Sequence, residues 1–117
     1  MSNEKLCQKF LRASADQVRK RGLARGILQN GIGEVCMLGA MNACGVTANL
    51  EERIKIEKHL SKVIVPKIPP IGIYDEYNKC EVWRDSRPNY IIAAWSNMLA
   101  KDAEEVARVF EKAAEDC

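Results

Sequence analysis

The chain has 117 residues and a formal net charge of +2, and 47% of its residues are hydrophobic. These values predict one folded globular domain over residues 1–117, rather than a disordered chain or a string of domains. No apolar run approaches the roughly 18 residues of a membrane-spanning helix, and the first residues do not resemble an export signal. We therefore expect a cytoplasmic protein.

The first predicted element is an amphipathic helix over residues 4–21. Gly22 is expected to end it, because glycine readily takes the left-handed conformation found after helices. Residues 23–35 then predict a short β-hairpin. Its turn would be Asn30-Gly31, the pair preferred where both central residues of a two-residue turn need positive φ.

Two further helices are predicted in the middle of the chain. The first is short, covers residues 36–44 and is stopped by Gly45. The second begins near Asn49, which can form a capping box with Glu52. Pro66 ends this longer helix, because the residue before a proline is disfavoured in helical conformation.

Residues 66–88 form an inserted segment rich in proline and aromatic residues, and it contains all four prolines of the chain. Lys79–Trp83 can form a short strand, but most of the segment is expected to be a loop. Long loops in small domains are usually functional or partly disordered. Aromatic and arginine side chains dominate interface hot spots, and the candidate partner-binding residues are Tyr74, Tyr77, Trp83, Arg84 and Arg87. Alternatively, Trp83 and one tyrosine fold back onto the helices.

The chain closes with a helix over residues 89–98 and a last helix that Asp102 caps together with Glu105. The predicted fold class is mainly α, with α+β at its margin: a compact bundle of four to five helices with a short β-hairpin after the first helix. The expected core residues are Leu38, Met41, Ile56, Leu60, Ile91, Trp95, Val106, Val109 and Phe110.

Charge is distributed unevenly along the chain. Residues 1–30 carry seven Lys and Arg against two acidic residues, whereas residues 97–117 carry three against six. If the first and last helices pack together, these charges partly neutralise each other. This interpretation is favoured over a nucleic-acid surface, which needs clustered basic residues without nearby acids.

The five cysteines are irregularly spaced and odd in number. Without an export signal, this pattern predicts free thiols in a reducing compartment. Structural zinc sites usually contain Cys-x₂₋₄-Cys pairs, which are absent, and the glycines do not match a phosphate-binding motif. We therefore expect no metal and no cofactor.

Cys36 is the strongest chemical candidate, because a thiol at a helix N-terminus feels the positive end of the helix dipole. A thiol enzyme also needs a base, and His59 is the only histidine of the chain. The alternative is that Cys36 is a small buried residue. A catalytic role for Cys36 and His59 is therefore kept only as an alternative, and a non-enzymatic protein is favoured.

Several short motifs resemble a family of short bacterial and phage proteins known only as a domain of unknown function. The motifs are Arg21-Gly22, Cys36-Met37-Leu38-Gly39-Ala40, Trp95-Ser96-Asn97, Glu104-Glu105-Val106 and Ala113-Ala114. The family pattern has Trp-Asn-Asp at the third motif. Here Ser96 replaces the asparagine and Asn97 replaces the acid, which weakens an enzymatic interpretation.

The functional hypothesis from the sequence is a cytosolic, non-enzymatic interaction or regulatory protein that binds a macromolecular partner through residues 66–88. Because the resemblance includes phage proteins, it implies a counter-defence or host-modulating inhibitor as one specific form. A small-molecule binder or sponge and the thiol-dependent enzyme remain alternatives. A protein partner and self-association are compatible with this hypothesis, whereas membrane and nucleic-acid partners are not expected.

Overall fold

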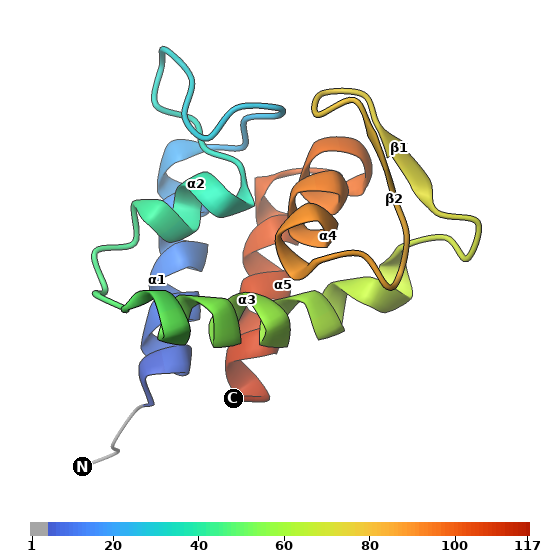
Figure 1. The fold of residues 1–117 in the computed structure, drawn as a ribbon. Helices are drawn as coiled ribbons and strands as arrows, with labels where there is room; N and C mark the ends of the chain where they lie inside the picture. Colours follow the sequence, from blue (N-terminus) through green and yellow to red (C-terminus); the bar gives the residue numbers. More distant parts are fainter. Residues whose placement is uncertain (1–4) are drawn as a thin grey trace.

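The computed structural model describes residues 5–117 and is mainly helical, with one small antiparallel β-hairpin (Figure 1). Among these residues, no helix combines the length and the apolar character needed to cross a membrane. The elements are α1 (Leu6–Arg21), α2 (Met37–Asn42), α3 (Leu50–Ile64), a 3₁₀ turn (Val65–Lys67), β1 (Ile73–Asp75), β2 (Cys80–Val82), α4 (Pro88–Ala94), a π-helical turn (Trp95–Leu99) and α5 (Ala103–Glu115).

Helices α1 and α5 lie side by side and run in opposite directions, as Figure 1 shows. Each places an apolar face toward the other, because hydrophobic residues recur every three to four positions in both sequences. Leu11 and Val18 of α1 and Phe110 of α5 are fully buried. The predicted packing of the first helix on the last is confirmed.

Arg19 connects the two helices at their surface. Its guanidinium donates to Glu104 at 2.9 and 3.0 Å and to Glu111 at 2.6 and 2.8 Å. The hydrogen bonds from Arg19 lower the pKa of Glu104 from 4.5 to about 2 and also lower the pKa of Glu111. The pairing of basic and acidic helix charges expected from the sequence therefore occurs at this arginine.

Helix α3 crosses α1 and α5 in front of them in Figure 1 and also packs on α4. Its capping box is formed as predicted: Glu52 N–H donates to Asn49 Oδ1, and Asn49 N–H donates to Glu52 Oε1. Of the nine expected core residues, eight are buried and Leu38 is only partly buried. Leu38 instead lines a surface groove.

The small hairpin does not follow the first helix, which corrects the predicted position. It is formed by β1 and β2, whereas residues 23–35 contribute only isolated bridges to Val35. The chain does turn at Asn30, but the turn is closed by a side chain: Asn30 Oδ1 accepts from the N–H groups of Ile32 and Glu34. The positive φ falls on Gly33, at 92°, and not on the Asn30-Gly31 pair. Local side-chain bonding therefore replaces the tight hairpin turn.

Residues 66–88 contain more secondary structure than the loop predicted for them. Ile68 and Val82 are buried in the main core, so the segment closes one side of the helix bundle. The hairpin turn is stabilised by Asp75, whose Oδ1 accepts from the N–H groups of Tyr77 and Asn78. The strand predicted at Lys79–Trp83 is confirmed as β2.

Cys7 and Cys117 form a disulfide, with 6.0 Å between their Cα atoms, which corrects the prediction that all five thiols are free. The cause is the antiparallel packing of α1 and α5. It brings the first turn of α1 beside Cys117, two positions after the end of α5, although 110 positions separate the two cysteines in sequence. Cys36, Cys44 and Cys80 are free.

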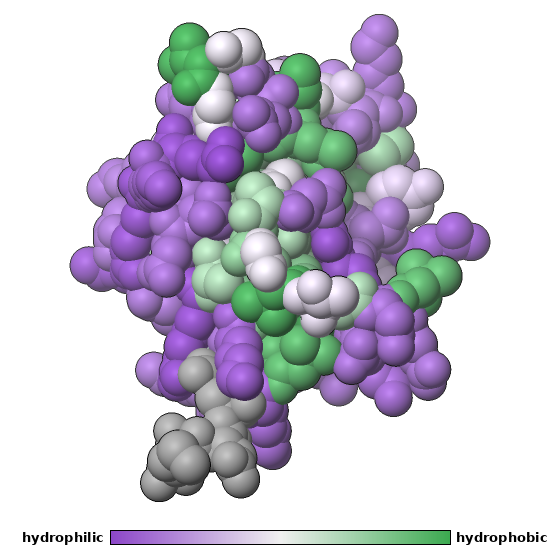
Figure 2. Space-filling view, turned by 90° about the vertical axis from the view of Figure 1, so that its left-hand side faces the viewer, coloured by the Kyte–Doolittle hydropathy of each residue, from purple (hydrophilic) through white to green (hydrophobic). Residues whose placement is uncertain are grey.

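Hydrophobic side chains on the surface are scattered. On the face that Figure 2 shows, they form an interrupted strip between broad hydrophilic regions. Isolated surface hydrophobic residues are normal in soluble domains, whereas a large continuous patch would indicate a contact surface. This face therefore gives no reason to expect a large apolar interface.

Candidate functional site

The π-helical turn Trp95–Leu99 is the centre of a polar network. Arg25, from the segment between α1 and α2, donates to the carbonyl oxygens of Ser96 and Asn97 at 3.1 Å and of Ala100 at 2.6 Å. Carbonyl groups at the end of a helix lack partners within the helix. Arg25 supplies these partners and so connects the first third of the chain to the end of α4.

Asp75 is the most buried charged residue in the network, at 1% exposure. Besides the two backbone N–H groups of the hairpin turn, it accepts from Asn78 Nδ2 at 2.9 Å and from Asn97 Nδ2 at 3.2 Å. Asn97 in turn accepts from Gly26 N–H at 2.7 Å. A buried carboxylate is tolerated when donors surround it, and the Asp75–Asn97 pair connects the hairpin to the helices.

The start of α2 is also hydrogen-bonded to the π-helical turn. Ser96 Oγ accepts from Met37 N–H at 3.2 Å, and Cys36 Sγ accepts from Gly39 N–H at 3.4 Å. A Cβ at Gly39 would collide with the Leu28 carbonyl oxygen, so only glycine fits there. The Cys36–Ala40 motif and the Trp95–Asn97 motif, far apart in sequence, therefore meet in space.

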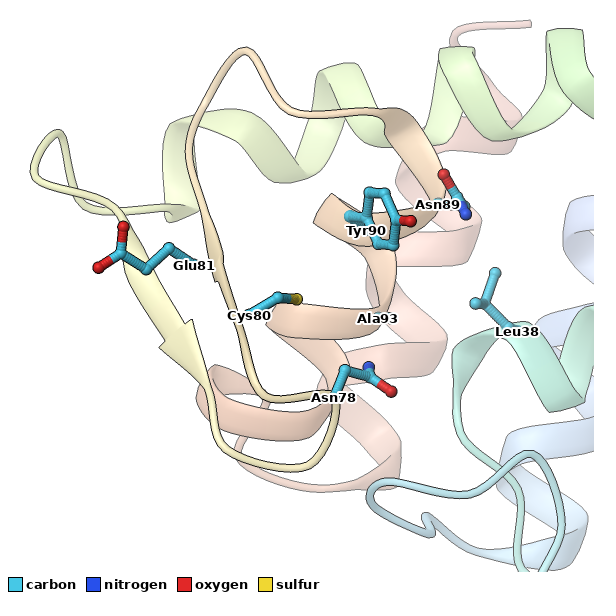
Figure 3. A pocket seen from close by; sticks show the side chains of 7 residues that line it. All are labelled: Leu38, Asn78, Cys80, Glu81, Asn89, Tyr90 and Ala93. Carbon is cyan, nitrogen blue, oxygen red and sulfur yellow. The ribbon is translucent and has the colours of Figure 1, made fainter.

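A groove of about 600 Å³ opens between α2, α4 and the hairpin. Figure 3 shows Leu38 facing Tyr90 and Asn89 across the opening, with Asn78 and Cys80 on the hairpin side and the Glu81 carboxylate directed away from them. The volume lies in the range of small-molecule pockets, and the lining mixes apolar and hydrogen-bonding groups as such pockets do. The lining residues are Leu38, Asn78, Cys80, Glu81, Asn89, Tyr90 and Ala93.

A smaller recess of about 130 Å³ shares Leu38, Asn78 and Ala93 with this groove. The recess reaches Cys36 and Asn97, so both motifs contribute to its walls. Cys36 and Cys80 are thus free thiols that line two adjacent hollows.

Of the five predicted partner-binding residues, two line one hollow. Tyr74 and Trp83 line a shallow hollow on the outer side of the hairpin and are 52% and 45% exposed. Tyr77 instead lies over Gly26, where an added Cβ would collide with its ring. Arg84 donates to the Ile68 carbonyl oxygen at 2.7 Å, and Arg87 precedes α4.

The structure does not bring the alternative catalytic pair together. Cys36 caps α2 and lies in the recess, where its sulfur accepts from Gly39. His59 Nε2 lies 2.7 Å from the Ala113 carbonyl oxygen, in a cluster with Cys7 and Cys117. No base among the described residues is bonded to Cys36, so the geometry gives no support to the thiol-enzyme alternative.

Sequence reasoning missed the groove residues Asn78, Asn89 and Tyr90 and the network residues Arg25 and Asp75. Each lies in a segment without helical periodicity or near a helix end, and the bonds that join Arg25 and Asp75 to the π-helical turn span more than twenty positions. One signal was available: Asn97 stands where the family pattern has an acid, and Asn97 is the residue that donates to Asp75. A carboxylate at position 97 would face another carboxylate.

No curated protein and no solved structure matches this chain. Residues 3–116 match the model of a family of unknown function (DUF6197), so the chain belongs to this family, as its short motifs indicated.

Proposed function

We propose that this protein is a non-enzymatic binding protein whose ligand is a small organic molecule held in the groove between α2, α4 and the hairpin. The observation that carries the proposal is the convergence of three separate segments on one hollow of about 600 Å³. The groove also shares three lining residues with the recess to which both sequence motifs contribute.

The lining defines the chemistry of the ligand. Leu38, Ala93 and the ring of Tyr90 offer apolar contact, while the amides of Asn78 and Asn89 can both donate and accept hydrogen bonds. No Lys, Arg or His is among the described residues that line the groove, and Glu81 is at its rim. A neutral, partly aromatic molecule fits this surface better than an anion does.

The free thiol of Cys80 gives a direct test, because it lines the groove and is partly buried. Neutral aromatic compounds, including nucleosides, are screened for protection of Cys80 against alkylation. Cys44 is the matched control, since it is also free and partly buried but is not among the groove residues. A true ligand should slow alkylation of Cys80 and leave that of Cys44 unchanged.

The variant Ala93→Leu fills the groove and should weaken binding of any such ligand at least about tenfold, which corresponds to about 1.4 kcal/mol. Ile54→Ala, on an exposed face of α3, should bind normally. Ligands that bind the Ala93→Leu variant as well as the wild type, or that protect both cysteines equally, would contradict the proposal.

A second candidate is a protein partner on the outer side of the hairpin. It is favoured by one observation: Ile71, Tyr74 and Trp83 line the same exposed hollow. Capture of a specific partner by the wild type but not by folded Trp83→Ala would support this surface. The counter-defence or host-modulating inhibitor form follows from the family resemblance, whereas the sponge and self-association forms are further alternatives. The identity of what binds tests all of them.

A further inference from the structure

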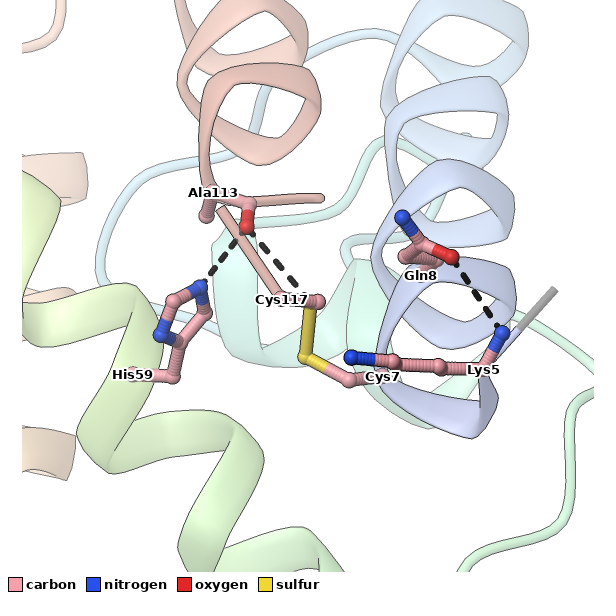
Figure 4. The surroundings of a disulfide bond; sticks show 6 residues. All are labelled: Lys5, Cys7, Gln8, His59, Ala113 and Cys117. Atoms are coloured by element: carbon pink, nitrogen blue, oxygen red, sulfur yellow. Dashed lines mark hydrogen bonds between the residues drawn. A yellow bond between two sulfur atoms is a disulfide. The ribbon is translucent and has the colours of Figure 1, made fainter. Parts of the chain in front are cut away.

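Three metal-ligating side chains from three separate elements meet at the corner where α1 and α5 are joined. They are Cys7 in the first turn of α1, His59 in the middle of α3, and Cys117 after α5. Their ligand atoms all lie within 4.8 Å of one another, and each residue is partly buried. Figure 4 shows the imidazole of His59 beside the disulfide.

This ligand set suits a borderline-soft divalent cation. Two thiolates and one imidazole are the protein ligands of one known type of zinc site, in which water takes the fourth position. Zn–S bonds of about 2.3 Å and Zn–N bonds of about 2.0–2.1 Å place tetrahedral ligand atoms about 3.5–3.8 Å apart. Opening the disulfide would let the sulfur atoms separate to this spacing without a large movement of either helix.

We propose that Cys7, His59 and Cys117 form a redox-gated site for one zinc-class ion. A dithiol reductant transfers two electrons and two protons to the disulfide, giving two thiols while the reductant becomes a disulfide. The ion then binds both sulfurs as thiolates, and two protons are released. Thiol–disulfide exchange with a small-molecule disulfide reverses this: the oxidant takes two electrons from the two thiolates and two protons from solvent, becomes two thiols, and leaves the Cys7–Cys117 bond re-formed and the ion expelled.

The present hydrogen bond of His59 fixes its ring beside the disulfide, but it uses the nitrogen that would bind the ion, because Nε2 must carry the proton to donate to a carbonyl oxygen. The nitrogen that lies 2.7 Å from the Ala113 carbonyl oxygen is on the side of the ring that faces α5. Coordination through this nitrogen uses the tautomer with its proton on Nδ1. The Ala113 carbonyl can then accept from a water molecule on the ion, so its hydrogen bond is replaced.

The site also explains why an ion would contribute to the fold. It would connect α1, α3 and the end of α5, whereas the disulfide connects only the first and last of these. An ion bound only to the folded chain stabilises it by mass action. The reduced protein should therefore show a higher Tm with zinc than without it, and the oxidised protein should show no change.

The test uses the full chain, reduced and kept under anaerobic conditions, with Co²⁺ as a spectroscopic probe and Zn²⁺ as competitor. We expect one Co²⁺ per chain, thiolate-to-cobalt charge-transfer absorption, the strong visible bands of tetrahedral cobalt, and displacement by Zn²⁺. His59→Gln and Cys7→Ser should each bind at least about 100-fold more weakly, since even the loss of an outer hydrogen-bond partner costs about 10–100-fold.

The control variant is Cys44→Ser, which replaces a free cysteine outside the groove and the recess, and it should bind as the wild type does. X-ray absorption of the zinc-loaded wild type needs no substitution and should show two sulfur neighbours at about 2.3 Å. The proposal is overturned if reduced wild type binds no more Co²⁺ than Cys7→Ser does, if Cys44→Ser loses the ion, or if the absorption shows no sulfur neighbours.

Discussion

Two regions of this molecule, the α1–α5 helix pair and the surroundings of the π-helical turn, are stabilised by different kinds of interaction. The α1–α5 pair is joined by buried apolar side chains, by Arg19 with its two glutamates, and by the Cys7–Cys117 disulfide. Around the π-helical turn, irregular segments are joined by the hydrogen bonds of three side chains, those of Arg25, Asp75 and Asn97. The first region follows from repeated patterns along helices, and the second depends on particular pairs of distant residues.

This difference predicts how each region responds to change. Apolar packing weakens in proportion to the volume removed, so helix-pair variants should lose stability gradually. A buried polar network fails when one partner is lost, because the remaining group is left without a hydrogen bond. The groove lies beside this second region, so changes in the network should also alter the groove.

The largest effect is expected from Phe110→Ala in the helix pair. Phe110 is fully buried, and removal of a buried phenylalanine ring costs about 3–5 kcal/mol. Chemical denaturation measures the loss, with Ile54→Ala, 55% exposed on α3, as the control. A loss below about 1 kcal/mol would show that Phe110 does not fill the interface.

Loss of the disulfide should have the next largest effect. Under oxidising conditions, Cys7→Ser should lower the free energy of unfolding by about 2–4 kcal/mol, because the bond closes a loop of nearly the whole chain. A reductant should lower the free energy of unfolding of the metal-free wild type by a similar amount and leave that of Cys7→Ser unchanged. If the reductant affects both proteins equally, another cysteine pair is involved.

In the polar network, Asn97→Asp restores the acid of the family pattern and should cost about 1–3 kcal/mol, because Asp75 loses a donor and faces a second carboxylate. The double variant Asn97→Asp with Asp75→Asn exchanges the two roles and should recover most of this loss. Thermal and urea unfolding of the four proteins form a double-mutant cycle. An additive cycle would show that the two side chains are not coupled.

The smallest effect concerns the surface ion pairs of the helix pair. The pKa of Glu104 is lowered from 4.5 to about 2, and that of Glu111 is lowered as well. The stabilisation is therefore present above the unfolded value and is lost as pH falls from 4.5 to about 2. The free energy of unfolding of Arg19→Gln should be lower than that of the wild type at neutral pH. The two values should become equal once both glutamates are protonated in acid.

Urea unfolding at several pH values measures this difference, with Lys55→Gln as the control because Lys55 pairs only within α3. Both glutamates are close to solvent, so the effect should also shrink with added salt. A difference between Arg19→Gln and wild type that persists unchanged in acid would contradict the ionic interpretation.

Much of the helical framework was predictable because its signals are local. The capping residues Asn49 and Asp102 begin α3 and α5, Pro66 follows α3 by two residues, and Phe110 lies on a continuous apolar stripe. The hairpin was misplaced because Asn30-Gly31 is a strong local turn signal. The actual turn is formed by the side chain of Asn30, and β1–β2 pairs within a segment interrupted by prolines.

The candidate site was less predictable for a related reason. Cys36 and Asn97 were recognised as parts of motifs, but nothing in their spacing shows that both reach one recess. His59 and Cys36 were considered together because each was chemically notable. In the structure, Cys36 at the start of α2 contacts Gly39, whereas His59 on α3 contacts Ala113 of α5.

By itself, the sequence determined the helices, their caps, their buried faces and the family to which the chain belongs, because each depends on residues a few positions apart. Only the tertiary structure decided the disulfide, the Asp75–Asn97 pair and the groove. Each of these joins residues more than twenty positions apart. Their contact depends on how whole helices are oriented, and that orientation results from the packing of many side chains at once.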